Sequence, residues 1–183
     1  MNRTWYQKLF SRDPKPDLQS TQAAADGGDS LAQFGLGLKY ASGTGAAQDY
    51  LQAAEWYLKA ADQSHALAQF NLGIMYARGQ GVPQDDAISV MWIRRSAALG
   101  DAAAQFNLGV RYQRASLDAV PMDASESRIE AYKWLNLAAT QGYLGSVAAC
   151  ERVTLTMTRE DVTAGNQRVA AFLAEMAKRP QTQ

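Results

Sequence analysis

Cysteine and histidine each occur only once in this chain, and their scarcity excludes several kinds of functional site. Cys150 alone can form neither a disulfide within the chain nor a cysteine-based zinc cluster. His65 alone rules out a zinc site built on several imidazoles, and it is the only residue around which a Ser-His-Asp triad could be written. We therefore expect no metal and no cofactor.

Charge of one sign is not in excess, because 18 basic residues balance 18 acidic ones. A nucleic-acid binder typically carries a strong basic excess, so no nucleic-acid partner is expected. Apolar residues make up 47% of the chain, which is enough for a packed core.

Long hydrophobic runs are also missing from the N-terminal segment, residues 1–16. Without a signal peptide or a membrane span in this segment, we predict a cytoplasmic protein. Trp5 with Leu9, and Tyr6 with Phe10, are spaced as on one face of a short amphipathic helix. Such a helix could dock on the rest of the chain, bind a partner or, less favoured, bind a membrane surface. Alternatively, the segment is expected to be partly disordered.

One sequence pattern occurs three times. "AQFGLGLKYASGTGAAQD" starts at Ala32, "AQFNLGIMYARGQGVPQD" at Ala68 and "AQFNLGVRYQRA" at Ala104, at intervals of 36 residues. A fixed period of this length is the signature of a repeat architecture. We divide residues 17–183 into an N-terminal partial unit (17–30), unit one (31–65), unit two (66–101), unit three (102–143) and a C-terminal part (144–183).

Each unit is predicted to contain two helices. The first carries apolar residues with helical spacing and a glycine in its middle, Gly37, Gly73 or Gly109, where a neighbouring helix would approach closely. The second carries a tryptophan between small residues, predicted to lie in the core: Trp56, Trp92 and Trp134.

Unit three departs from the period, because Trp134 follows Trp92 by 42 residues instead of 36. The turn glycines are absent there, so an exposed loop is predicted over residues 115–127. The C-terminal part reads as a partial unit and a closing helix, with Thr158 and Asp161 resembling a capping box.

These residues resemble the Sel-one-like repeat family, relatives of the tetratricopeptide repeat. The resemblance implies an all-α fold, a right-handed α/α superhelix, or solenoid, of helix-turn-helix units. It also implies a non-catalytic adaptor or scaffold, often bacterial, that binds a protein or peptide. Two alternatives remain: a hydrolase of the β-lactamase-like type linked to disulfide-rich relatives, from which this chain departs, and a structural protein that assembles with itself.

The tetratricopeptide phase places a protein-binding groove along the first helices. The candidate binding residues are Phe34, Leu38, Phe70, Asn71, Ile74, Arg78, Phe106, Asn107, Val110 and Arg114. Alternatively, the three phenylalanines only pack against neighbouring units. Arginine binds carboxylates and the apolar floor accepts a large side chain, so an acidic partner with an apolar anchor is expected.

Overall fold

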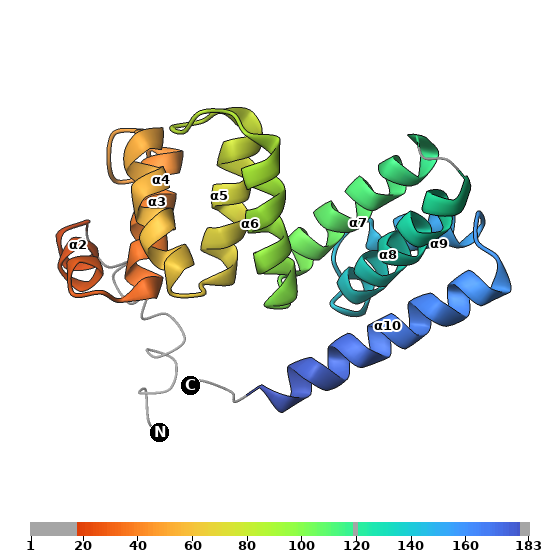
Figure 1. Cartoon of the computed structure of the whole chain (residues 1–183). Helices are drawn as coiled ribbons and strands as arrows, with labels where there is room; N and C mark the ends of the chain where they lie inside the picture. The colour runs from red at the N-terminus through yellow and green to blue at the C-terminus, as the bar shows by residue number, and fades with distance from the viewer. Residues whose placement is uncertain (1–17, 119–120, 180–183) are drawn as a thin grey trace, which may run out of the picture.

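The computed structural model describes residues 18–118 and 121–179, where every regular element is a helix (Figure 1). The predicted all-α repeat solenoid is confirmed, and the segment 1–16 lies outside the described residues. The helices are α2 (Leu18–Asp26), α3 (Ser30–Ser42), α4 (Tyr50–Asp62), α5 (Ala66–Arg78), α6 (Asp86–Ala98), α7 (Ala102–Asp118), α8 (Pro121–Thr140), α9 (Ser146–Thr154) and α10 (Arg159–Lys178).

The two helices of each unit approach closely at the glycine of the first helix. A Cβ atom on Gly73 would lie 2.8 Å from Ile93 Cγ1 and 3.1 Å from the carbonyl oxygen of Ser89, both on α6. On Gly37 it would meet the ring of Tyr57, and on Gly109 the side chain of Leu135. The glycines are therefore required by helix packing, although each lowers helix propensity.

The turn between the two helices uses the residues that the repeat conserves within this chain. Gly79 ends α5 with φ of 66°, a left-handed conformation that glycine adopts without strain. The side chain of Gln84 then donates to the carbonyl of Ala77, and Asp85 caps α6 by accepting from the Ile88 amide. The same arrangement of glycine, glutamine and aspartate recurs at Gly43, Gln48 and Asp49.

The prediction of an exposed loop over residues 115–127 is wrong. The extra residues of unit three lengthen the two helices instead, so that α7 continues to Asp118 and α8 begins at Pro121. Ala115 occupies the position of the helix-ending Gly43 and Gly79, so α7 has no residue there that favours a left-handed end. Pro121 is well suited to the first position of α8.

The C-terminal helix α10 begins with the predicted capping box, in which Thr158 and Asp161 exchange hydrogen bonds. It does not pair with α9 as a second helix would. Instead it lies along α8, where Arg168 forms ion pairs with Glu126 and Glu130. In Figure 1, α10 runs back beneath α8 toward the middle of the molecule.

Buried glutamines join each unit to the one before it. The Nε2 atoms of Gln33, Gln69 and Gln105 donate to the carbonyls of Ala25, Ala61 and Ala97, near the end of the preceding helix. Two of these glutamines also accept a hydrogen bond, Gln33 from Gln63 and Gln105 from Gln141.

Gln69 is the exception, because its Oε1 atom is buried without a hydrogen-bond partner. The residue that corresponds to Gln63 and Gln141 in this unit is Leu99, which has no donor in its side chain. An unsatisfied buried acceptor destabilises the folded state by about 1–3 kcal/mol.

The close approach at Gly73 predicts that Gly73→Leu destabilises the protein by about 1–3 kcal/mol or more, because the side chain would overlap α6. Gly35→Ala is the control, since a Cβ there meets only the Thr21 methyl carbon at 3.7 Å. Urea unfolding measures both. A wild-type midpoint for the Gly73 variant would contradict close packing at this glycine.

The unpartnered Gln69 predicts that Leu99→Gln stabilises the protein by about 1 kcal/mol, because the new amide can donate to Oε1. The converse change, Gln63→Leu, removes the donor from Gln33 and should lower stability by a similar amount. Thermal unfolding of the two variants should shift in opposite directions. Equal shifts would show that these hydrogen bonds do not determine the stability of the contacts between consecutive units.

Candidate binding wedge between units two and three

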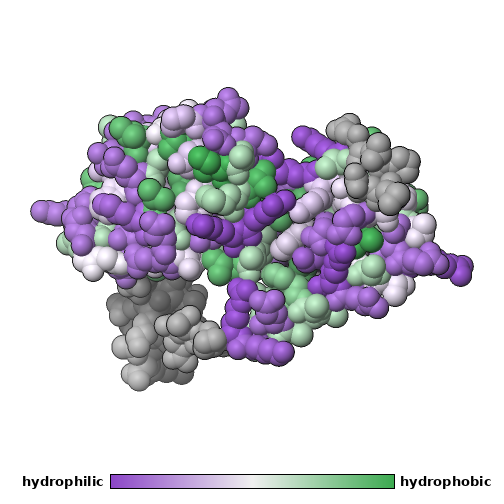
Figure 2. Space-filling model, viewed as in Figure 1, coloured by the Kyte–Doolittle hydropathy of each residue, from purple (hydrophilic) through white to green (hydrophobic). Residues whose placement is uncertain are grey.

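The first helices of units two and three are less closely stacked than those of the other units. Helix α3 approaches α5, and α7 approaches α9, but α5 and α7 remain further apart. A cavity of about 550 Å³ opens between α5, α6 and α7. Figure 2 shows the surface hollowed at the upper edge between the α2–α6 part and the α7–α10 part. We call this cavity the wedge.

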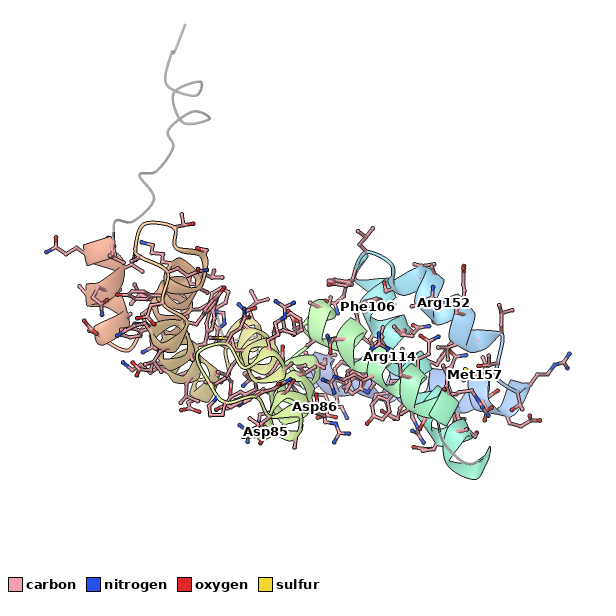
Figure 3. The ribbon with its side chains drawn as sticks, turned by 90° about the horizontal axis from the view of Figure 1, so that it is seen from above. Asp85, Asp86, Phe106, Arg114, Arg152 and Met157 are labelled. Atoms are coloured by element: carbon pink, nitrogen blue, oxygen red, sulfur yellow. The ribbon has the colours of Figure 1, made fainter. Side chains whose placement is uncertain are left out.

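Half of the predicted binding residues line the wedge. Helix α7 supplies most of them, and Figure 3 shows Phe106 and Arg114 along it, with Asp86 at the start of α6. The lining residues are Ile74, Ala77, Asp86, Ile93, Phe106, Asn107, Val110, Arg111 and Arg114. Its lining therefore combines five aliphatic or aromatic side chains with four polar or charged ones.

A bidentate ion pair crosses the wedge from α6 to α7. The two terminal nitrogens of Arg111 lie 2.6 Å and 3.0 Å from the carboxylate oxygens of Asp86. This hydrogen bonding lowers the pKa of Asp86, against a smaller opposing effect of burial. The charge of Arg111 is thereby neutralised, whereas Arg114 is exposed and forms no ion pair with a described residue.

The two asparagines of the predicted groove differ in their surroundings. Asn71 hydrogen-bonds to the hydroxyl of Tyr57, whose pKa is raised to about 12, mainly by burial. Asn107 occupies the same position in unit three, but Ile93 stands where Tyr57 would be. Its side chain has no hydrogen-bond partner among residues 18–118 and 121–179 and remains available in the wedge.

The phenylalanines are half-buried and pack against neighbouring elements, as in the alternative interpretation. Phe34 stacks on His65 with the ring centres 4.6 Å apart, and Phe106 lies 5.2 Å from the ring of Tyr143. Phe70 packs against the core cluster that contains Trp134. Of the three, only Phe106 also lines the wedge.

Five predicted binding residues lie outside the wedge: Phe34, Leu38, Phe70, Asn71 and Arg78. Arg78 is exposed at the end of α5. The wedge is also lined by Ala77, Asp86, Ile93 and Arg111, which are not among the predicted binding residues. Opposite charges 25 residues apart carry no helical or repeat spacing, so no sequence signal could have paired Asp86 with Arg111.

His65 and Cys150, the residues that could have suggested catalysis, have structural surroundings. The Nδ1 atom of His65 accepts from the Ala68 amide and caps α5, as Asp29 and Asp101 cap α3 and α7. Partial burial raises the pKa of the Cys150 thiol, which favours the less nucleophilic protonated form.

Within the described ranges, no group of three or more acidic, histidine or cysteine side chains could hold a metal ion. No helix in those ranges is long and apolar enough to cross a membrane.

His65 predicts a pH dependence of stability. Partial burial places its folded-state pKa below the usual 6.5, so the unfolded chain binds the proton more readily. The stabilisation is complete above pH 6.5 and is lost as pH falls through the folded-state pKa, when Nδ1 can no longer accept. His65→Asp restores the cap used at Asp29 and should flatten this loss. Urea unfolding of the wild type and of His65→Asp between pH 7.5 and 5 measures the free energy of unfolding. An equal loss of stability in the two proteins would contradict the role of His65 in this pH dependence.

Comparison with known proteins places the repeat in a family. The family model for the Sel1 repeat matches residues 30–65, 66–101 and 102–143. A comparison with curated proteins finds no match. Sel1 repeats are generally protein–protein interaction modules and are typically non-catalytic.

Two crystal structures of bacterial proteins are similar to this one. A protective antigen present in uropathogenic Escherichia coli strains, which displays an SLR fold, is 27% identical with a TM-score of 0.72. The match covers 87% of this chain but 33% of the antigen, so this chain spans about a third of its length. A Sel1 repeat protein from Oxalobacter formigenes is 33% identical with a TM-score of 0.61, over 74% of this chain and 97% of the other. The chain therefore belongs to the Sel1 repeat family.

Proposed function

We propose that this protein is an adaptor or scaffold that binds a segment of another protein in the wedge between units two and three. The observation that carries the proposal is a cavity of about 550 Å³ that is lined by both apolar and polar side chains, in which Arg114 and Asn107 have no partner in the described part of the chain. An apolar pocket with a few convergent polar groups is the usual form of a binding site.

The chemistry of the wedge favours an acidic group beside a large apolar side chain. Because Asp86 neutralises Arg111, the remaining charge at the cavity is that of Arg114. Its guanidinium can bind a carboxylate through two parallel hydrogen bonds. Ile74, Phe106 and Val110 offer apolar surface for the anchor, and Asn107 can bind the backbone of the segment.

No catalytic role is proposed. His65 uses Nδ1 as a helix cap, and the raised pKa of Cys150 disfavours the thiolate. Both observations count against the hydrolase alternative, which would require an activated base or nucleophile.

The proposal predicts that Arg114→Glu abolishes capture of the binding partner, because it reverses the charge at the wedge. The double change Arg78→Glu with Arg114→Glu should behave in the same way. Arg78→Glu alone is the matched control, since Arg78 lies one repeat earlier and outside the wedge. Quantitative mass spectrometry of captured proteins compares the variants, and circular dichroism checks their folding. A folded Arg114 variant that keeps its partners would remove the wedge from the binding site.

A further inference from the structure

Each tryptophan of the repeats fills a groove between two earlier helices. Trp56 of α4 packs in the groove between α2 and α3, and only 6% of it is exposed. Trp92 and Trp134 belong to the equivalent clusters one and two units later. The groove residues that cluster with them recur in register: Leu18, Ala25, Leu36 and Tyr40 for Trp56; Ala54, Ala61, Leu72 and Tyr76 for Trp92; Ala97, Leu108 and Tyr112 for Trp134.

The next groove of the series, between α8 and α9, is open. It forms a cavity of about 560 Å³. Tyr132, Ala139, Cys150 and Thr154 line it, and they follow Val90, Ala97, Leu108 and Tyr112 by the 42 residues of unit three. The cavity is therefore a fourth site of the kind that the three tryptophans occupy, and no described tryptophan lies in it.

The groove is open because α10 packs elsewhere. Gly165 allows α10 to approach Tyr132 on α8, where a Cβ would lie 2.5 Å from the ring. The aromatic residue of α10, Phe172, packs edge-on against Trp134 at 5.6 Å. As a result an exposed apolar stripe remains along α9 and the residue that follows it, with Val147 57% and Leu155 87% exposed. Glu151 lies between these two residues on the same helical face and also lines the groove.

The chain has a fourth tryptophan, Trp5, in the N-terminal segment. The spacing of Trp5 with Leu9, and of Tyr6 with Phe10, predicts an amphipathic helix that could supply an apolar face with a tryptophan. Residues 1–17 also hold four basic residues against two acidic ones, which complements Glu151 in the groove. The basic residues are Arg3, Lys8, Arg12 and Lys15.

We propose that the N-terminal segment of a second copy of this chain binds in the groove between α8 and α9, with Trp5 in the fourth tryptophan site. Trp5 precedes Leu18 by 13 residues, and Pro14 and Pro16 disfavour a helix over the last of them. A helix over residues 5–10 followed by extended chain spans at most about 35 Å. The groove lies at the other end of the array from α2, beyond α3, α5 and α7 (Figure 1). Helices pack about 8–10 Å apart, so the four steps from α2 to α9 span about 32–40 Å even without the wider separation of α5 and α7. The segment is therefore too short to pass around the array to the groove of its own molecule.

This contact joins two different surfaces and leaves one of each free. Such a head-to-tail interface produces open chains or rings, not a symmetric dimer. It goes beyond the proposed partner binding, because the wedge is not involved.

Sedimentation of the full-length protein tests this association. The wild type should exceed the monomer mass of 19.9 kDa increasingly with concentration. Concentrations up to about 100 µM are sufficient for a Kd in the micromolar range. Trp5→Ala, which removes the inserted ring, and Val147→Glu, which places a charge beside the groove, should each remain monomeric. Leu51→Glu is the matched control, since Leu51 is 60% exposed on α4 and far from the groove, and it should associate like the wild type.

Mixing the two monomeric variants gives the decisive result. Trp5→Ala keeps an intact groove and Val147→Glu keeps an intact segment, so together they should form a dimer that grows no further. A wild type that stays monomeric overturns the proposal, whether the groove then holds the chain's own segment or another protein. Association that survives Trp5→Ala, or a mixture that stays monomeric, overturns it as well.

Discussion

Close approach of the two helices within each unit is the constraint on which the rest of the structure depends. At Gly73 the backbone of α6 and the side chain of Ile93 lie so near that no side chain fits. The ring of Tyr57 fills the corresponding space at Gly37, and Leu135 fills it at Gly109. Because the pair is this tight, the tryptophan of the second helix is directed into the groove before it. One glycine per unit thus determines both the pairing of helices and the burial of a large ring in each junction.

The junctions between units are built from a second, polar interaction. A buried glutamine donates to the end of the preceding helix and, in two of three cases, accepts from a glutamine near the end of its own unit. These hydrogen bonds fix the register because a shifted glutamine would be buried without a partner. Leu99 interrupts the pattern next to Gln69, so the junctions differ in strength although the helices stack similarly.

Unit three changes the geometry of the array. The wedge opens where α5 and α7 are separated, and the displacement of α10 onto α8 leaves the groove beside α9 open. Both candidate binding surfaces therefore lie where regular stacking is interrupted. In a regular array the next helix covers such surfaces, so an interruption is the physical condition for an apolar site that another chain can reach.

The sequence by itself determined the period, the helix pairs, the core tryptophans, the close-packed glycines and the capping box at Thr158, because each follows from local spacing. It predicted five of the nine residues that line the wedge, since a repeat phase identifies which face of α7 is turned inward. Only the tertiary structure decided that six extra residues lengthen two helices, that Asp86 pairs with Arg111 and that α10 packs on α8 instead of α9. These outcomes depend on contacts between residues far apart in the chain, such as Arg168 with Glu126, which no period records.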